Sequence, residues 1–558
     1  MLQKSQRKKL KSVNDLMVKL AYIMVLKGKT VPLLMLLKLY FLLLFISALS
    51  NAQIVNIPDA NFKGRLIALG FDTNNDGDIQ LTEAENITTL NVSESNISDL
   101  TGIMSFPNLV ILYCSYNTLS DLNVSGLSNL QLLDCSNNQI TNINLTGVSN
   151  LGSLNCSYNL LTTLNGVSST ISNLRCNNNK LTSFNALNLD NLIELDISNN
   201  KIVSFSLNTA PNLAYLTCNS NLLTSLNVNA FSNLVALDCS DNNLTALNIS
   251  NLSLLTSITC KINPELTSVN LSNLNSLWSI DLTGNRDPGN GTNVPIEGNI
   301  NSLALVNLPQ LNSINCSYNK LTSLELTNLS SLISLDCSFN LLTNLSLTNL
   351  PNLTYLQCYV NKFQSLDVTS LTSLTVLRCG SGHYNNNQIT NVLQNLNVAG
   401  LSNLVILECF DTLISSIDLT GLTNLQNLSF LGIQNAGVLN SLDVSGCTNL
   451  KNLTCRHTQL TSLNVNNLTN LEHLTCTNSL ISTLNLNGLL NLKSLDYSFN
   501  YLTNVNLFNL PLLEVLGCTG NQLTSLDISN LTSLKSLSCG FNQLTTLNLN
   551  GLTSLVNL

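Results

Sequence analysis

The residues of this chain whose types and spacing could do chemistry lie in a twelve-residue segment near the amino terminus. Oxygen-bearing side chains occupy its positions 1, 3, 5, 7, 9 and 12, namely Asp72, Asn74, Asp76, Asp78, Gln80 and Glu83. Gly77 permits the sharp turn that such a segment needs. Calcium binds oxygen ligands at this spacing, where the seventh residue gives its backbone carbonyl, the ninth acts through water and the twelfth is bidentate. The segment therefore predicts one calcium ion with a structural role; the alternative is an acidic turn without metal.

The elements on either side of this segment must hold its ends. Asp59 is a typical first cap for a helix that would run through Phe62, Leu66 and Leu69 to Gly70. After the segment there is room for only a short turn of helix. One helix and one loop resemble half of an EF-hand pair. We therefore expect a small helical unit in residues 53–88, and not a paired calcium sensor.

A repeated sequence motif, here called the phrase, covers most of the remaining chain and contains sixteen of the seventeen cysteines. Around Cys114, apolar and polar residues alternate, which predicts a strand with one buried face. Asn117 follows three residues later, where a buried amide can bond the backbone of its own turn and of the next. Alternation resumes at Leu122 and Val124, which predicts a second short strand on the opposite wall. The cysteine position recurs, mostly every 21 residues, at Val92, Cys114, Cys135, Cys156, Cys176, Ile197, Cys218, Cys239, Cys260, Leu282, Cys316, Cys337, Cys358, Cys379, Cys409, Phe430, Cys455, Cys476, Tyr497, Cys518 and Cys539.

These 21 phased copies predict a solenoid, in which each turn covers the apolar edge of its neighbour. The phrase LxxLxCxxNxL resembles the leucine-rich repeat family, in the 21-residue IRREKO-type form of bacterial proteins. The resemblance covers about residues 87–558, and we assign the repeats themselves to residues 89–558. It implies a β-rich solenoid with parallel strands on its concave wall, usually a binding role, and no chemistry. Because residues 53–88 adjoin the first repeat, we expect them to form its amino-terminal cap.

The cysteines themselves occupy a core position. Ile197, Leu282 and Phe430 take the same place in other repeats, and Cys447 falls where Leu127 falls. A buried free cysteine behaves as a small hydrophobe. Thiols stacked about 4.8 Å apart and pointing the same way have poor geometry for a disulfide. We expect reduced core thiols, and no zinc site, because each layer supplies one sulfur.

Charge divides the chain after residue 52. Residues 1–52 hold nine of the 23 basic residues and one acid, which leaves 14 bases and 30 acids, a net charge of about −16, for the rest. This acidity argues against nucleic acid or an anionic membrane as partner. The apolar run Leu39–Leu49, followed by Ser50 and Ala52, predicts a secretory signal cleaved after Ala52, and so a secreted or cell-surface protein with no membrane insertion after cleavage. A membrane anchor is the alternative, for which the run is short. Because the stretch before Met24 or Met35 is longer than a signal needs, we expect the start codon to be assigned too early.

Three consecutive repeats break the polar pattern of the open strand face. They present Tyr355, Gln357 and Tyr359, then Val376, Arg378 and Gly380, then Ile406, Glu408 and Phe410, with Leu431, Arg456 and His473 close by. Clustered aromatic and arginine side chains are typical of binding hot spots. We expect a ligand-binding patch for a protein or glycan on the concave wall, beside an inserted loop at residues 380–384. A second insertion covers residues 286–297. Drift among the repeats is the alternative, and the ladder asparagine is replaced nearby by Thr412, Ile433, Thr458 and Ser479.

A row of aspartates, here called the acidic file, lies on the same strand face. We expect these side chains only to keep that face solvated. The acidic file consists of Asp134, Asp196, Asp238, Asp281, Asp336 and Asp496.

Catalytic arrangements are not apparent in the sequence. The histidines His383, His457 and His473 are not at metal spacing, and the carboxylates Glu194 and Asp196 lie on an open, wet strand face. We therefore expect a non-enzymatic, secreted or cell-surface binding protein, an adhesin or receptor-like scaffold. The alternative is the targeting arm of a larger exported enzyme.

The last residues suggest a fragment. Leu552, Leu555 and Leu558 repeat the phase of the leucines before Cys539, so the chain ends inside a predicted strand with an uncovered apolar edge. We expect the gene to continue into more repeats and a cap.

Overall fold

The computed structural model describes residues 53–186, 188–284, 298–380, 393–433, 437–466 and 468–558. The predicted secretory signal, the insertion at 286–297 and residues 381–384 of the predicted loop lie outside this part of the chain. Within it, no helix has the length and apolar character needed to cross a membrane.

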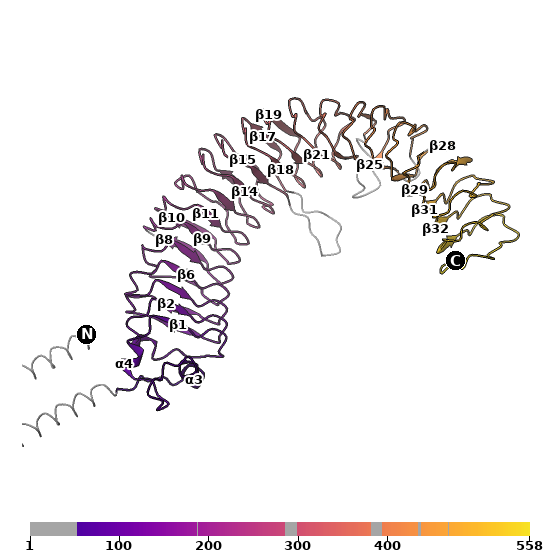
Figure 1. Cartoon of the computed structure of the whole chain (residues 1–558). Helices are drawn as coiled ribbons and strands as arrows, with labels where there is room; N and C mark the ends of the chain where they lie inside the picture. The colour runs from indigo at the N-terminus through magenta and orange to yellow at the C-terminus, as the bar shows by residue number, and fades with distance from the viewer. Residues whose placement is uncertain (1–52, 187, 285–297, 381–392, 434–436, 467) are drawn as a thin grey trace, which may run out of the picture.

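One parallel sheet of 21 strands runs from end to end of the described solenoid. Figure 1 shows an arch, with this sheet along its inner wall. Its strands are β1 (Thr89–Asn91), β2 (Ile111–Tyr113), β4 (Leu132–Asp134), β6 (Ser153–Asn155), β7 (Asn173–Arg175), β9 (Glu194–Asp196), β11 (Tyr215–Thr217), β12 (Ala236–Asp238), β14 (Ser257–Thr259), β16 (Ser279–Asp281), β18 (Ser313–Asn315), β20 (Ser334–Asp336), β21 (Tyr355–Gln357), β23 (Val376–Gly380), β25 (Ile406–Thr412), β26 (Asn427–Gly432), β27 (Asn452–Arg456), β29 (His473–Thr475), β31 (Ser494–Asp496), β32 (Val515–Gly517) and β33 (Ser536–Ser538). The predicted solenoid is confirmed.

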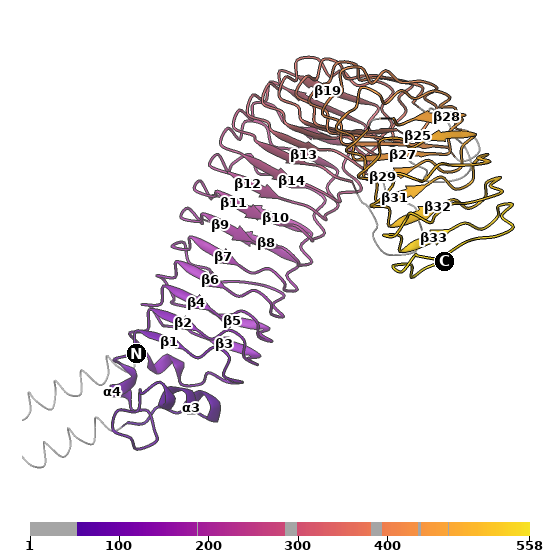
Figure 2. The ribbon, with the colours of Figure 1, turned by 45° about the vertical axis from the view of Figure 1, so that its right-hand side comes forward.

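The second wall carries pairings of two strands each, which run alongside the strands of the inner sheet (Figure 2). Six two-stranded parallel sheets form there. They pair β3 (Asp121–Asn123) with β5 (Asn142–Asn144), β8 (Ser183–Ala186) with β10 (Ser204–Leu207), β13 (Ala246–Asn248) with β15 (Ser268–Asn270), β17 (Ser302–Val306) with β19 (Ser323–Thr327), β22 (Ser365–Asp367) with β24 (Asn395–Asn397), and β28 (Ser462–Asn464) with β30 (Thr483–Asn485). The second strand predicted for each repeat therefore forms in only twelve repeats of the described chain, and its sheets join repeats in pairs and do not run continuously.

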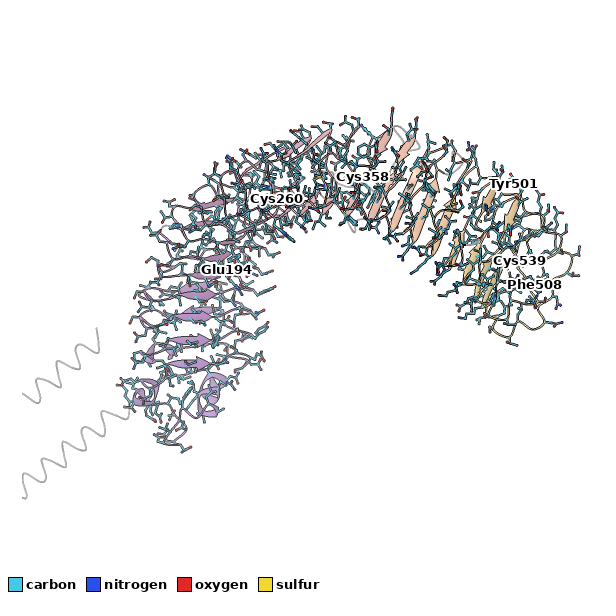
Figure 3. The ribbon with its side chains drawn as sticks, turned by 45° about the horizontal axis from the view of Figure 1, so that its top comes forward. Glu194, Cys260, Cys358, Tyr501, Phe508 and Cys539 are labelled. Carbon is cyan, nitrogen blue, oxygen red and sulfur yellow. The ribbon has the colours of Figure 1, made fainter. Side chains whose placement is uncertain are left out.

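The core is a column of leucines and thiols between the two walls. In β2 the central Leu112 is fully buried while its neighbours are half-exposed, and Leu112 pairs with Leu133 of β4 in the same register. All seventeen cysteines are free and all but Cys539 are buried. The sulfurs of Cys379 and Cys409 approach to 3.8 Å. Burial raises the pKa of the Cys455 thiol to about 12, so this thiol stays protonated at neutral pH. Figure 3 labels Cys260 and Cys358 along the arch and Cys539 near its carboxyl end.

A ladder of buried asparagines fastens each turn to the next, as Asn340 illustrates. Its amide nitrogen donates to the carbonyl oxygens of Cys316 at 3.0 Å, Cys337 at 3.0 Å and Ser338 at 3.1 Å. Its side-chain oxygen accepts the backbone N–H of Leu321 at 3.0 Å. One side chain therefore satisfies backbone groups in two turns, which strand pairing leaves without partners.

A second asparagine ladder, which was not predicted from the sequence, runs along the surface. Asn352 donates from its amide to the carbonyl oxygen of Ser330 at 2.8 Å, and Asn150 does the same to Ser128 at 2.8 Å. These side chains are exposed, so water competes for the bond. The Asn-Leu pair that recurs before many, but not all, of the concave strands is the sequence signal for this ladder.

Five repeats near the carboxyl end carry alternating charges in one surface column. The residue just before the concave strand is Lys451, Glu472, Lys493, Glu514 and Lys535 in turn. The ammonium nitrogen of Lys493 lies 2.5 Å from a carboxylate oxygen of Glu472, and that of Lys535 lies 2.8 Å from Glu514. These residues are also joined through their backbones, because Glu514 N–H donates to Lys493 O at 2.8 Å. We call this set the charge column.

The amino-terminal end of the solenoid is covered by α3 (Ala60–Ala68) and α4 (Leu81–Ala84) (Figure 1). Asp59 caps α3 with one carboxylate oxygen, and its other oxygen accepts the backbone N–H of Ser98 at 2.8 Å in the first repeat. Phe62 and Leu66 of α3 are fully buried in the same core as the repeats. The cap and the repeats therefore share one continuous core.

Candidate functional site

The concave sheet is widest where the ladder asparagine is replaced. Strands β23, β25, β26 and β27 have 5, 7, 6 and 5 residues, while β21 and β29 on either side have 3 each. In the repeats of β25, β26 and β27 the asparagine is replaced by Thr412, Ile433 and Thr458. Without an amide to bond the turn, strand pairing continues for several residues. Ser479 also replaces the amide, and its hydroxyl lies 2.7 Å from that of Thr458, but its strand β29 stays short.

The predicted patch lies on the amino-terminal side of this widened region, where its residues are in register across β21, β23 and β25. Tyr355, Val376 and Ile406 form one row, Gln357, Arg378 and Glu408 a second, and Gly380 and Phe410 a third, with Tyr359 following β21. Gly380 has a positive φ of 115°, and a Cβ there would meet the carbonyl oxygen of Phe410 at 2.0 Å, so only glycine lets these two strands meet. The structure therefore brings the residues of the three predicted repeats together. We call them the concave patch.

Hydrogen bonds connect the polar side chains of the concave patch. Arg378 Nε donates to Glu408 Oε2 at 2.8 Å, and Arg378 Nη1 donates to the hydroxyl of Tyr355 at 3.0 Å. The Tyr355 hydroxyl donates to Gln357 Oε1 at 2.6 Å. Gln357 Nε2 donates in turn to the hydroxyl of Tyr359 at 3.2 Å. The side chains are half-buried and hold one another, so little rotamer freedom remains to be lost when a ligand binds.

Asp336 of β20 completes this network from the neighbouring strand. Its Oδ2 accepts from Gln357 Nε2 at 3.0 Å, and its Oδ1 accepts the backbone N–H of Ser338 at 3.0 Å. Burial raises the pKa of Asp336, the bonds from Ser338 lower it, and the nearby charge of Asp281 raises it, with a net upward shift.

An aromatic stack continues from the concave patch toward the preceding repeats. The rings of Tyr318 and Phe339 are stacked with centroids 4.1 Å apart, and Phe339 meets Tyr359 edge-to-face at 5.1 Å. Tyr318 and Phe339 have left-handed backbone, with φ of 58° and 53°, at the residue that precedes the ladder asparagine. These two rings were not predicted, because they lie at turn positions that follow the strands of the open face. Aromatic residues also hold this turn position in four other repeats, so the sequence alone does not single out these two rings: Tyr116, Tyr158, Phe499 and Phe541.

The other residues named near the patch lie farther along the sheet. Leu431 pairs with Phe410 on one side and Arg456 on the other, so both extend the third row. His473 is exposed and pairs with Asn452, outside that row. The predicted loop residues His383 and Tyr384 lie outside the described residues.

The acidic file on the concave wall has a local structural role beyond solvation. Asp134 accepts from the backbone N–H of Ser136 at 3.0 Å and from its hydroxyl at 2.7 Å. Asp196 makes the same pair of bonds to Ser198. An acidic residue before the core position and a hydroxyl residue after it thus close a local turn.

The segment with calcium-ligand spacing folds into a loop between α3 and α4. Asp72 accepts from the backbone N–H of Gly77 at 2.9 Å, Asn74 from that of Asp76 at 2.9 Å, and Asp76 from that of Asp78 at 2.9 Å. Each of these side chains is therefore turned back toward the loop that carries it. Hydrogen bonds from the Asp78 backbone and the Gln80 side chain lower the pKa of Asp76, so this carboxylate is charged at neutral pH.

Glu83 closes the loop from α4. Its Oε1 accepts from the backbone N–H and the hydroxyl of Thr73 at 2.8 and 2.7 Å, and its Oε2 accepts the backbone N–H of Gln80 at 2.9 Å. Asp78 instead pairs outward with Lys63 at 2.5 Å, which suits a position that would offer its backbone carbonyl. Within the described chain, no three His, Cys, Asp or Glu side chains converge to hold an ion by themselves. The amide oxygens of Asn74 and Gln80 would have to contribute, and all these donors are of the oxygen type that calcium prefers.

The two carboxylates that could suggest an enzymatic role, Glu194 and Asp196, both bond neighbouring side chains. Glu194 is ion-paired with Arg175 at 2.8 Å, and Asp196 bonds Ser198. Figure 3 shows Glu194 on the arch near its amino-terminal half.

Comparison with known proteins places the fold. No family model matches the chain, and no curated protein matches its sequence. Among solved structures, YopM from Yersinia enterocolitica matches with a TM-score of 0.63 at 23% identity, covering 85% of this chain and 92% of that chain. This likeness, at that identity, shows a leucine-rich repeat solenoid and nothing further.

Two other solved structures match less closely. The functional domain of InlJ from Listeria monocytogenes, described as including a cysteine ladder, matches with a TM-score of 0.36 at 25% identity over 88% of this chain and 76% of that one. The Arabidopsis receptor kinase HAESA, solved with the peptide hormone IDA and the co-receptor SERK1, matches with a TM-score of 0.44 at 19% identity over 83% and 87%. Superpositions as loose as these two carry no information about the function of this chain.

Proposed function

We propose that this chain is a non-catalytic binding scaffold, and that the concave patch holds its macromolecular ligand. The observation that carries the proposal is the preformed network of Tyr355, Gln357, Arg378 and Glu408 at the boundary between β21 and the widened strands β23 and β25. Tyrosine and arginine side chains that are already ordered give contact area at a low entropic cost. The paired charges within the patch favour a protein ligand, while a glycan is the second candidate.

The experiment compares the wild-type full chain with a double variant, Tyr359→Ser and Phe410→Ser. Both chains are immobilised and presented with arrays of extracellular proteins and of glycans, and bound ligands are measured by surface plasmon resonance. We expect the double variant to bind its ligand roughly tenfold or more weakly, with an unchanged circular dichroism spectrum. The matched control is Tyr116→Ser with Tyr158→Ser, which removes two aromatic rings that are 60% and 54% exposed elsewhere on the solenoid. Equal binding by the patch variant and the control would contradict the proposal.

We further propose that the loop from Asp72 to Glu83 holds one calcium ion that stiffens the amino-terminal cap. Asp72, Asn74, Asp76 and Glu83 would bind through side-chain oxygens, Asp78 through its backbone carbonyl and Gln80 through water. The ion would neutralise the acidic loop and join α3 to α4. Because Asp59 connects α3 to the first repeat, an ordered loop would also hold the cap on the solenoid.

The place of action that fits these features is outside the cell. An exported protein is supported by the apolar run before Ala52 and by the acidic repeat region. The alternative of a targeting arm on a larger exported enzyme uses the same patch in the same way.

A further inference from the structure

The only tryptophan of the chain stands on the concave edge, far from the concave patch in sequence. Trp278 immediately precedes β16, and its side chain is 55% exposed. Its backbone is held on both sides, because its N–H donates to Thr256 O at 2.8 Å and its carbonyl oxygen accepts from Asn312 N–H at 2.9 Å. An exposed indole on an anchored backbone is a fixed apolar platform in an otherwise polar region.

The indole forms one side of an open hollow of about 550 Å³. Hydroxyl and amide side chains line the rest of it: Thr256, Ser257, Ser276, Ser279 and Gln310. The volume falls within the roughly 300–1,000 Å³ of small-molecule sites. Ser257 and Ser279 face the hollow from paired positions of β14 and β16. None of the lining side chains carries a charge.

Most of these polar groups are available to a ligand. Thr256 donates its hydroxyl to Val235 O at 3.0 Å. In the described part of the chain, the side chains of Ser257, Ser276, Ser279 and Gln310 have no hydrogen-bond partner. Three hydroxyls and an amide supply both donors and acceptors in the hollow that the indole also lines.

We propose that this hollow binds a neutral saccharide unit, which deepens the proposed binding function by naming a second site and its ligand class. A pyranose ring has an apolar C–H face, which the indole would cover, and hydroxyls around its rim, which the serines and Gln310 would bond. The lining has no cation for a phosphate or carboxylate group, and a quaternary ammonium would need several aromatic walls where there is one. A saccharide matches both the single platform and the uncharged rim.

The test uses the single tryptophan as its own reporter. The full chain is titrated with maltohexaose, cellohexaose, mannohexaose and chitohexaose while the emission of Trp278 is recorded. Saturable binding of at least one probe should shift the emission to the blue, because the sugar displaces water from the indole. A hexamer of galacturonate, which carries carboxylates, should not bind. If no neutral hexamer changes the emission at millimolar concentration, the proposal is overturned.

Variants locate the site by calorimetry, which does not need the fluorophore. We expect Trp278→Ala to lose roughly tenfold or more in affinity for the probe that binds, and Gln310→Ala to weaken it. Ile193→Ala is the matched control, because Ile193 holds the same place in its repeat, is 45% exposed and makes the same backbone bonds. Unchanged binding by Trp278→Ala, or an emission change with peptides and not with sugars, would refute the saccharide site.

The outcome is separable from that of the concave patch. The Tyr359→Ser and Phe410→Ser variant should bind the saccharide probe as the wild type does. If that variant loses its macromolecular ligand while no hexamer binds, the scaffold function stands and the Trp278 site falls. If hexamers bind, and the patch variant binds every array ligand as the wild type does, the Trp278 site stands and the concave patch is not the ligand site.

Discussion

Replacement of one buried ladder asparagine should destabilise the solenoid far more than replacement of one surface ladder asparagine. The perturbation is Asn340→Ala, and Asn352→Ala is its control. Asn340 makes four hydrogen bonds, three as donor through its amide nitrogen and one as acceptor from Leu321 N–H. Asn352 makes one, to Ser330 O at 2.8 Å, on the exposed surface.

The magnitude depends on the groups that each lost bond leaves behind. The carbonyl of Cys316 keeps the amide of Asn319 and that of Cys337 keeps Asn361, so these acceptors stay satisfied. Leu321 N–H, within a fully buried residue, keeps no partner. A buried orphan donor costs about 1–3 kcal/mol, and three weakened acceptors add about 1 kcal/mol together, which gives a loss of about 2–4 kcal/mol. For Asn352→Ala, where water replaces the amide, we expect less than about 1 kcal/mol.

Hydrogen exchange and urea unfolding, read together, provide the assay. A solenoid can open locally, so exchange of the amides around Leu321 reports the repeat itself, while urea reports the cooperative unit. In Asn340→Ala the protection of these amides should fall while that of repeats near β2 stays the same. Equal losses in the two variants, or protection lost evenly along the chain, would refute the ladder as the fastening between turns.

Two further results are expected. Calcium should bind the wild-type full chain in calorimetry. The Glu83→Ala variant should bind calcium roughly tenfold or more weakly, since one bidentate ligand is lost. Absence of binding heat in the wild type would contradict the calcium proposal. The raised pKa of Asp336 means that the folded state holds its proton more tightly than the unfolded state, so this group's contribution to stability is present at low pH and is lost as pH rises through the folded pKa. Asp336→Asn should therefore raise the free energy of unfolding at neutral pH, with a gain that fades on acidification; a gain independent of pH would show that burial of the charge is not its cause.

The repeat phrase was enough to predict the architecture, because its parts act locally. The strand alternation around Cys114 and the asparagine three residues later specify a turn that any neighbour with the same phrase will cover. The concave patch was also foreseeable, since the three repeats that depart from the phrase are consecutive and strand pairing aligns them. The network from Arg378 to Tyr359 could not be predicted, because side-chain bonds across strands depend on rotamers and burial. The Trp278 hollow was missed because its lining comes from ordinary serine and threonine positions of neighbouring repeats.

The breaks in the second wall were also not predicted from the sequence. Local alternation indicates where a strand can form, but repeat spacing does not determine whether it pairs. β22 and β24 pair across a step of 30 residues, from Ser365 to Asn395, whereas no second-wall strand of the described chain lies 21 residues after β5 or β19.

The charge column restricts how this part of the gene can change in length. Tandem repeats gain and lose units by unequal recombination, and each unit here adds one residue to the alternation from Lys451 to Lys535. Deletion of one unit, for example the one carrying Glu472, would place Lys451 directly beside Lys493 and replace an ion pair by a repulsion. Deletion of two neighbouring units would restore the alternation. Lineages that vary in repeat number should therefore differ by even numbers of units across this column, while the uncharged repeats that carry Ala214 and Val235 at the same position are free to change one at a time.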